Sequence, residues 1–462
     1  MKIIIAGAGR VGSSIVSNLA QESNDLFLID TNADLLAEIQ QQTDIATICG
    51  NVTDPETLAN AGAANADMLI ALTDSDETNI VACQIAHTLF KVPKKLARIR
   101  SESFLKRKDI LFCANAIPID VVISPEEEVT RFIRNLVLYP GSHQVLSFGN
   151  GLLQLCELRA KPDGALVGKS LDELSERIGS IPVRAAAIYR NDALLIPKSK
   201  TVIEVNDRIF FTAPTRQLNK VIQSLLEIDK PYKRLMIAGG GRIGFSLAKS
   251  LETRMQVKII VKNPARARLI AEQLDHTMVL TGDAADEALL LEENIERADV
   301  FCAVTNDDEV NIMSAMLAKR LGARKVMSLV DRPAYMEMVD SGTIDNAIFP
   351  QYNTIGNILA EVRNGPVSQV HSLMRGRAEA LEVTIGGSAD LSDLPRSRIE
   401  QIQLPPGAII VGVIRGFEVL ASRGNVELQE GDKIIVFIYD KSAIPAVESL
   451  HFYGQKRKSR NA

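Results

Sequence analysis

Residues 2–12 read Lys-Ile-Ile-Ile-Ala-Gly-Ala-Gly-Arg-Val-Gly, an apolar run that leads directly into a Gly-x-Gly-x-x-Gly loop. The run is typical of a buried strand, and Ser13–Ala20 after the loop is predicted to be helical. In such a unit the first glycine forms the turn, the second lets the backbone approach a pyrophosphate, and the third lets the helix pack on the strand. Because the amides at the helix start also attract phosphate, the stretch predicts a Rossmann-like nucleotide site.

An acidic residue stands where such a site needs one. Asp30 follows the next predicted strand, Leu26–Ile29, and lies 18 residues after Gly12. A carboxylate at that strand end accepts hydrogen bonds from the ribose hydroxyls of a dinucleotide. The alternative is that the glycines only serve packing in a sheet that binds nothing. The presence of strand, loop, helix and acid together favours nucleotide binding.

The same pattern occurs twice in the 462 residues. Gly7–Gly12 returns as Gly-Gly-Gly-Arg-Ile-Gly at Gly239–Gly244, at an offset of 232. The stretch Ala71–Asn79 returns at the same offset as Ala303–Asn311, whereas later matches have an offset of 225. The chain is therefore one unit written twice, and the second copy is seven residues shorter.

Each copy changes character part-way along. Its first part alternates short apolar strands with helices, which indicates a doubly wound parallel sheet. A helix at Pro125–Leu138 follows, with three Glu at its start and Arg toward its end, as suits the helix dipole. In the first copy the expected strands are Lys2–Ala6, Leu26–Ile29, Met68–Leu72 and Lys95–Ile99, and the expected helices between them are Ser13–Ala20, Ala33–Gln40, Pro55–Ala61 and Glu77–Phe90.

The fold class that follows is α/β, with two tandem Rossmann-like, doubly wound parallel-sheet domains, each followed by a small α+β domain. In the first small domain the expected strands are Leu152–Leu158, Val183–Ile188 and Arg208–Thr212. The predicted segments are a first sheet domain at 1–123, a crossover helix at 124–142, a small domain at 143–227, a second sheet domain at 232–348, a second crossover helix at 349–367, a second small domain at 368–453 and a basic tail at 454–462.

Composition excludes several classes of protein. The 52 Lys and Arg residues against 57 Asp and Glu give a net charge of −5, too even for a protein that neutralises nucleic acid phosphates. Apolar runs are far shorter than the roughly 20 residues of a membrane span, and no signal peptide is recognisable. Five scattered Cys and five scattered His argue against a disulfide framework or a metal site, so we expect a cytosolic protein with reduced thiols.

Charged residues at the predicted strand ends add candidates for phosphate binding. Arg10 and Arg242 lie inside the two Gly loops, where a guanidinium meets a phosphate bidentately on its own ligand or across a subunit interface. Arg98 and Arg100 lie on one face of a late strand, and either phosphate binding or an ordinary salt-bridged edge explains them equally well.

The fourth strand of each copy ends in a Thr. Thr73-Asp74 and Thr305-Asn306 lie at the carboxyl edge, where ligands bind in open sheets. Helix capping before Glu77 and Glu309 is the alternative, and both roles are compatible.

The second copy departs from the first at the strand-end acid. Aligning the two copies places Val261 opposite Asp30, with Lys262 next to it, and no acid lies in Val257–Arg266. Val261 offers no acceptor to a ribose. We therefore expect the second loop to be empty or to favour ATP, ADP or NADP over NAD.

Together these motifs resemble the TrkA family, the peripheral nucleotide-binding subunits of the Trk potassium-uptake system, built from tandem RCK units. The resemblance covers nearly the whole chain and rests on Gly7–Gly12 with Asp30, on Ala71–Asn79, on Ala97–Ser101 and on Ala303–Arg320. It implies a homotetrameric ring on the inner face of the cell membrane that binds NAD(H) and ATP or ADP. Ligand exchange would change the ring and gate a potassium-translocating membrane partner.

The resemblance also implies which residues contact the nucleotide. Asn51 stands where the family commonly has Asp, and Val261-Lys262 where the second copy often has an acid. The expected contacts are Gly7, Ala8, Gly9, Arg10, Val11, Gly12, Asp30, Thr31, Asn51, Val52, Thr73, Asp74 and Arg98 in the first copy, and Gly239, Gly241, Arg242, Gly244, Lys262, Asp283 and Thr305 in the second.

Two function classes remain after this comparison. A regulatory subunit changes conformation on binding its ligand and turns nothing over, whereas an NAD-dependent oxidoreductase needs an acid or base beside the nicotinamide. No Tyr-x-x-x-Lys pair, Ser-His-Asp set or pair of carboxylates stands out in the sequence. We therefore expect no catalytic residue and no metal ligand, and favour the regulatory function.

Overall fold

The computed structural model of the chain describes residues 1–20, 24–113, 115–191, 193–227, 231–339, 342–363, 367–386, 398–399, 402, 404–420 and 426–449. Its internal contacts divide the chain into two compact units. The first comprises Met1–Val129 and Phe349–Ile358, and the second comprises Thr130–Ile348 and Leu359–Ala462. The predicted basic tail at 454–462 lies outside the described residues.

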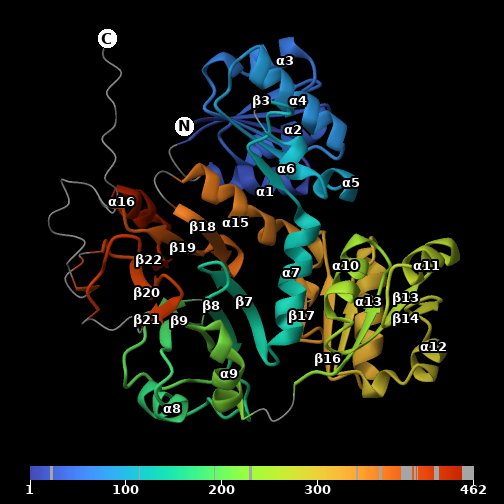
Figure 1. The fold of residues 1–462 in the computed structure, drawn as a ribbon, viewed down its shortest axis with the longest axis vertical. Coiled ribbons are helices and arrows are strands. Elements are labelled where there is room, and N and C mark those ends of the chain that lie inside the picture. The colour runs from blue at the N-terminus through green and yellow to red at the C-terminus, as the bar shows by residue number, and fades with distance from the viewer. Residues whose placement is uncertain are drawn as a thin grey trace. The chain divides into compact units, whose positions relative to one another are not determined.

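The first unit is built on a six-stranded parallel sheet, drawn in blue and cyan in Figure 1. The strand order is β3-β2-β1-β4-β5-β6, which reverses direction between β1 and β4 and so places the ligand crevice of such sheets there. The strands are β1 (Lys2–Ala6), β2 (Asp25–Asp30), β3 (Ala46–Cys49), β4 (Met68–Ala71), β5 (Lys94–Arg98) and β6 (Val121–Ile123). The helices are α1 (Arg10–Leu19), α2 (Ala33–Gln42), α3 (Pro55–Asn60), α4 (Asp76–Thr88), α5 (Glu102–Leu105) and α6 (Lys108–Leu111), with the first turns of α7 (Pro125–Leu138) and of α15 (Pro350–Val362).

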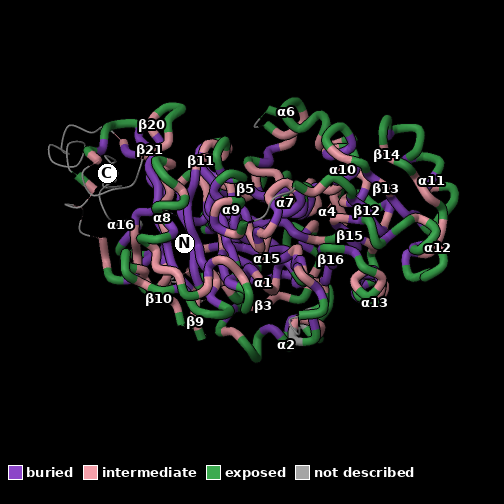
Figure 2. The backbone as a smooth tube through the Cα atoms, turned by 90° about the horizontal axis from the view of Figure 1, so that it is seen from below, coloured by how far each residue is buried: buried purple, intermediate pink, exposed green. Residues whose placement is uncertain are grey.

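Central strands and capped helices explain why this sheet forms. Ile3, Ile4 and Ile5 are fully buried, since helices cover both faces of a parallel sheet. Figure 2 shows the buried parts of the chain in purple and the exposed parts in green. Asn32 caps α2 by accepting hydrogen bonds from two amides of its first turn, and Asp54 caps α3 by accepting one, from the Glu56 N–H.

The second unit contains a parallel sheet of the same order, β14-β13-β12-β15-β16-β17. The strands are β12 (Arg234–Ala238), β13 (Gln256–Val261), β14 (Thr277–Thr281), β15 (Val300–Ala303), β16 (Lys325–Leu329) and β17 (Asn346–Ile348). The helices are α10 (Arg242–Leu251), α11 (Pro264–Ala271), α12 (Glu287–Glu292), α13 (Asp308–Arg320) and α14 (Met336–Val339). The repeat read from the sequence is therefore also a repeat of topology.

Two antiparallel sheets complete the second unit, in the matching orders β10-β9-β11-β8-β7 and β18-β19-β22-β20-β21. The first comprises β7 (Ser142–Phe148), β8 (Leu153–Arg159), β9 (Arg184–Arg190), β10 (Ala193–Leu195) and β11 (Arg208–Pro214), with α8 (Leu171–Ile178) and α9 (Leu218–Leu226). The second comprises β18 (Val367–Leu373), β19 (Ala378–Thr384), β20 (Ala408–Arg415), β21 (Glu418–Leu420) and β22 (Lys433–Ile438), with α16 (Ile444–Ser449). The predicted fold class is confirmed.

The two antiparallel sheets share one hydrophobic core. Phe148 and Phe210 of the first sheet pack with Val411 and Phe437 of the second, and the rings of Phe210 and Phe437 have centroids 6.0 Å apart. The Thr212 hydroxyl also donates a hydrogen bond to the Val411 carbonyl. Each sheet thus buries one apolar face on the other.

Most predicted elements of the first copy lie within two or three residues of their observed bounds, and Lys2–Ala6 and Pro125–Leu138 match them. The predicted strands omitted β3, β6, β7 and β10, which the structure adds. In the described part of the chain, no helix combines the length and the apolar character that a membrane crossing requires.

Candidate nucleotide-binding sites

The first Gly loop gives each glycine a different role. Gly7 has φ 105°, a left-handed conformation, and its N–H donates to the Ile29 carbonyl at 2.8 Å. A Cβ on Gly12 would lie 1.9 Å from the Gly7 carbonyl oxygen, so α1 packs on the loop only with glycine there. A Cβ on Gly9 would meet no atom within 4 Å. The open side of the loop is therefore at Gly9.

Gly9 is also the N-cap of α1 and supplies no side chain to accept hydrogen bonds from the first turn. The first amides of α1 and the positive end of its dipole are thus directed at the open side of the loop. This is the arrangement in which a helix start holds a phosphate.

The Asp30 carboxylate lies directly beside this loop. One of its oxygens accepts the Ala8 N–H at 2.7 Å, and the other accepts the Asn32 N–H at 2.8 Å. Asp30 therefore ties the end of β2 to the Gly loop, and places an anionic acceptor where the sequence predicts a ribose.

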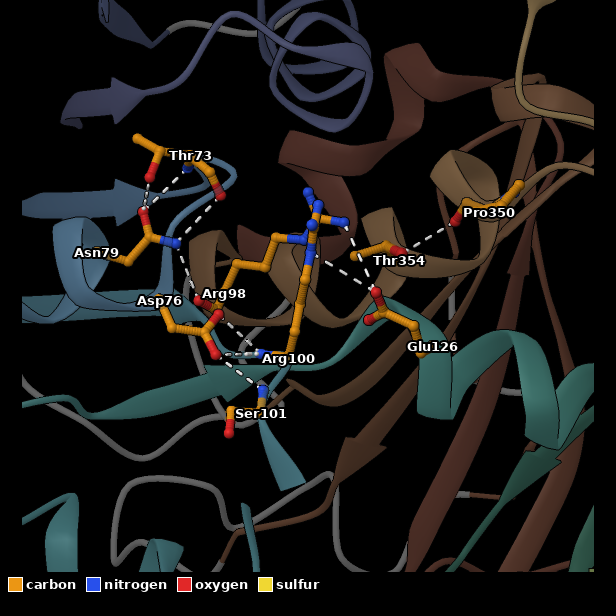
Figure 3. Close-up of polar contacts among 9 residues, drawn as sticks. All are labelled: Thr73, Asp76, Asn79, Arg98, Arg100, Ser101, Glu126, Pro350 and Thr354. Atoms are coloured by element: carbon orange, nitrogen blue, oxygen red, sulfur yellow. Dashed lines mark hydrogen bonds and ion pairs between the residues drawn. The ribbon is translucent and has the colours of Figure 1, made fainter. Parts of the chain in front are cut away.

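A buried amide joins the ends of β4 and β5. The Asn79 side-chain oxygen accepts the Thr73 N–H at 2.9 Å and the Thr73 hydroxyl at 2.7 Å. Its Nδ2 donates to the Thr73 and Arg98 carbonyls at 3.2 and 2.9 Å (Figure 3). Ser75, rather than Thr73 or Asp74, caps α4. From the sequence, Asn79 was recognised only as part of the repeated motif, and these hydrogen bonds, which clamp the ends of β4 and β5 together, were not predicted. The recurrence of Asn at position 311 was a signal that the residue has a structural role.

Arg98 and Arg100 converge on one carboxylate. Their guanidinium nitrogens lie 4.0 and 3.6 Å from the Glu126 Oε1 in the first turn of α7 (Figure 3). The three side chains are only 16, 31 and 23% exposed, so solvent screens the pairing incompletely. Of the two explanations left open by the sequence, the structure contains the ion pair.

The other residues of the first copy that are expected to contact the nucleotide differ in their exposure to solvent. Arg10, Thr31 and Asp74 are exposed, whereas Val52 is buried in the sheet core. Asn51 turns its side-chain oxygen to the N–H and hydroxyl of Thr53, at 3.0 and 2.9 Å. Ala8 and Val11 are also buried, so any contact of theirs with a ligand is made by the backbone.

The second Gly loop has the same backbone. Gly239 has φ 116° and donates to the Ile260 carbonyl at 2.9 Å, and a Cβ on Gly244 would lie 1.9 Å from the Gly239 oxygen. A Cβ on Gly241 would meet no atom within 4 Å, as at Gly9.

Side chains around the second loop differ from those around the first. The strand pairing Ala238–Ile260 repeats Ala6–Ile29, which confirms that Val261 occupies the place of Asp30. Val261 is buried, and Arg266 donates from Nε to the Gly240 carbonyl at 2.8 Å. Sequence reasoning missed Arg266, since nothing in its spacing distinguishes it from other surface arginines.

Lys262 and Asp283, both expected contacts, pair with each other. The Lys262 Nζ lies 2.8 Å from the Asp283 carboxylate, and this ammonium lowers the pKa of Asp283 from its usual value. Thr305 is held by Asn311 as Thr73 is by Asn79, through hydrogen bonds of 2.8 and 2.7 Å. Among the residues that the structure describes, no group of three or more His, Cys, Asp or Glu could hold a metal ion.

Family comparisons agree with this architecture. The TrkA-N domain family matches residues 3–125 and 235–350, which include both parallel sheets, and the TrkA-C domain family matches residues 155–226 and 391–450. The chain belongs to the TrkA family.

Individual relatives and one solved structure also resemble this TrkA-family chain over nearly its whole length. It is 48% identical to the Trk system potassium uptake protein TrkA of Halomonas elongata, over 98% of this chain and 99% of the relative. It is 46% identical to the protein of the same name from Vibrio alginolyticus, over 97 and 98% of the two chains. The GsuK RCK domain has the same fold, with a TM-score of 0.59 at 18% identity over 97% of this chain and 94% of that one.

Proposed function

We propose that this chain is a regulatory subunit of a potassium uptake system, which binds NAD(H) and ATP or ADP and thereby gates a potassium-translocating membrane partner. The observation that carries the nucleotide part is the Asp30 carboxylate, held 2.7 Å from the Ala8 amide at a loop whose open side is a helix start. The names of its relatives, Trk system potassium uptake protein TrkA, support the transport part. The GsuK channel bound to NAD, with a TM-score of 0.60, shares the fold.

In the first copy the backbone and the side chains have separate tasks. The amides of the Gly loop and of the α1 start hold the pyrophosphate, and Asp30 accepts the ribose hydroxyls. The proposed contacts in the first copy are Gly7, Ala8, Gly9, Arg10, Val11, Gly12, Asp30, Thr31, Asn51, Val52, Thr73, Asp74 and Arg98.

The second copy has a cationic edge without the ribose acid. We propose that it favours anionic nucleotides other than NAD, with Gly239, Gly241, Arg242, Gly244, Lys262, Asp283 and Thr305 as contacts. Arg242 is exposed in the loop, and Lys262 is available to an anionic ligand once it leaves Asp283.

Family membership supports a wider arrangement that we propose for the chain. The seven predicted segments remain our proposed domain division, with the crossover helices at 124–142 and 349–367. We propose that four chains assemble into a ring on the cytoplasmic face of the membrane, held there by the membrane subunit. Ligand binding shifts the ring between states only by its differential affinity for them, so no turnover is needed.

Reconstitution tests the proposal. Purified chain added to proteoliposomes that contain the membrane partner should make potassium flux depend on added ATP, ADP or NADH. Calorimetric titration of the same preparation measures the binding of each nucleotide. Potassium flux that does not change with any of the added nucleotides would contradict the regulatory function. Steady oxidation of NADH with carbonyl substrates would contradict it as well and favour an oxidoreductase.

A further inference from the structure

Three charged residues of the first copy are replaced together in the second. Strand pairing aligns Arg98 with Leu329, because Ala97 and Ser328, each one residue earlier, pair with the equivalent Ala71 and Ala303. The remaining two replacements are Asp331 for Arg100 and Gln351 for Glu126, the latter at the second residue of α15 as Glu126 is of α7.

The backbone that carries these residues is unchanged. Asp76 accepts the N–H groups of residues 100 and 101, and Asp308 accepts those of residues 331 and 332. Asn311 donates to the Leu329 carbonyl at 3.1 Å, as Asn79 does to that of Arg98. The fold therefore needs the hydrogen bonds made by these Asp and Asn side chains, but not the two arginines and the glutamate. Those three charged residues occur only in the copy that has Asp30.

The ion pair is also connected to the first Gly loop. A Cβ on Gly7 would lie 3.0 Å from the Thr73 nitrogen, and Asn79 links Thr73 to the Arg98 backbone. Arg98 thus ends its strand at the same carboxyl edge as the loop. Two guanidinium groups share the Glu126 carboxylate, and the Asp76 carboxylate is held by the backbone N–H groups of residues 100 and 101. A bound polyphosphate would meet the same two guanidinium groups.

We propose that Glu126 is an internal competitor for the ligand: Arg98 and Arg100 exchange its carboxylate for the terminal phosphates of a nucleotide bound at the first Gly loop. This inference rests on the proposed function of that loop. A di- or triphosphate terminus carries more charge than one carboxylate and accepts guanidinium bidentately, so it displaces Glu126, whereas a monophosphate competes weakly.

Displacement of Glu126 acts on α7. Its first turn belongs to the Met1–Val129 segment of the first compact unit, and the helix continues from Thr130 into the second unit. Release of Glu126 removes the ion pair that holds this turn to the end of β5. The occupied site therefore loosens the start of α7, which leads from the first unit into the second.

Calorimetric titration of the full chain with ATP and AMP, in buffer with EDTA, tests the competition. Glu126→Gln should tighten ATP binding roughly two- to fivefold, the value of a partly exposed ion pair, with little effect on AMP. Arg98→Gln should weaken ATP binding.

Glu127→Gln is the matched control, since Glu127 is exposed one residue further along the same turn, and the change should alter the affinity for neither ATP nor AMP. Gln occupies the equivalent position 351, so the helix start tolerates it.

Hydrogen exchange supplies a second readout. ATP should speed exchange of the amides in the first two turns of α7 in the wild-type chain, and Glu126→Gln should exchange fast without ligand. ATP binding that is the same in Glu126→Gln and Glu127→Gln, an equal gain for AMP, or α7 exchange unchanged by bound ATP would overturn the inference alone. A wild-type chain that binds no nucleotide would overturn the proposed function as well.

Discussion

Val261 lies against Gly240 so closely that a Cβ on Gly240 would be 2.7 Å from the valine Cγ2. In the first copy the equivalent contact is a hydrogen bond, from the Ala8 N–H to the Asp30 carboxylate. An apolar isopropyl group thus fills the place of an ionised acceptor beside an otherwise equal loop. The two copies have the same backbone but opposite chemistry at the position that would receive a ribose.

Asp30→Ala should weaken NADH binding by roughly 10- to 100-fold, because hydrogen bonds to a charged group contribute about 1.5–3 kcal/mol. Isothermal titration measures the loss directly. Asp34→Ala is the control, since this acid is exposed in the first turn of α2 and is four residues away in sequence. Undiminished NADH binding in Asp30→Ala would show that the strand-end acid does not hold the ribose.

Val261→Asp should create or strengthen a second NADH site, raising the stoichiometry toward two per chain. The new carboxylate would face the Gly240 backbone as Asp30 faces Ala8, and Arg266 nearby offsets part of the cost of burying the charge. Titration of wild type and variant at the same concentration reports the stoichiometry. Two equivalent NADH sites in the wild-type chain would contradict the division of the copies.

Arg10→Ala should weaken ATP more than NADH. Arg10 is exposed at the first residue of α1, and a triphosphate terminus offers more charge to a loop guanidinium than an internal pyrophosphate does. The two ligands are compared on one preparation, with Arg242→Ala as the equivalent change in the second copy. An equal loss for ATP and NADH would remove Arg10 from any role in reading the phosphate chain.

Gly9→Ala and Gly12→Ala should separate binding from folding. A methyl group on Gly9 meets no protein atom within 4 Å, so the variant should keep its melting temperature but bind nucleotide less well. A methyl group on Gly12 would collide with the Gly7 carbonyl, and such overpacking costs about 1–3 kcal/mol of unfolding free energy. Thermal denaturation followed by NADH titration distinguishes the two effects. Equal melting temperatures for both variants would contradict the assigned roles.

Repetition and glycine spacing predicted the fold and most of the candidate site, because each requirement there is local. The Gly7 turn, the helix start and Asp30 all lie within one strand–helix–strand unit. The edge strand β3 was missed because its Ala46–Cys49 run is half exposed and has no apolar signature. Strand β6 has only three residues.

Contacts between residues far apart in the sequence could not be predicted from it. Nothing in the amino-acid sequence alone reveals that Glu126 is beside Arg98 and Arg100, or that Arg266 reaches the Gly240 carbonyl. These pairings depend on where crossing elements bring long side chains together, which spacing along the chain does not encode. The internal repeat nevertheless held a usable signal, since the Arg98, Arg100 and Glu126 positions all change in the second copy.

Lys325 is buried and donates from Nζ to the Ser142 carbonyl at 3.0 Å. Burial lowers the pKa of Lys325 to about 8, against the smaller opposing effect of Asp345. A lysine in the unfolded chain has a pKa of about 10.4. Between pH values of about 8 and 10.4 the unfolded chain therefore binds more protons than the folded chain. The destabilising effect of Lys325 on the fold consequently decreases as the pH rises through that range.

Lys325→Met should therefore stabilise the second unit most below pH 8, and the advantage should shrink by on the order of 2 kcal/mol between pH 8 and 9.5. Denaturant unfolding of wild type and variant at both pH values gives this difference, in which the common titration of other groups cancels. Lys319→Met is the control, since Lys319 is partly exposed in an ion pair with Asp345 and should show no such decline. A stability difference that is independent of pH would mean that Lys325 stays charged in the folded chain.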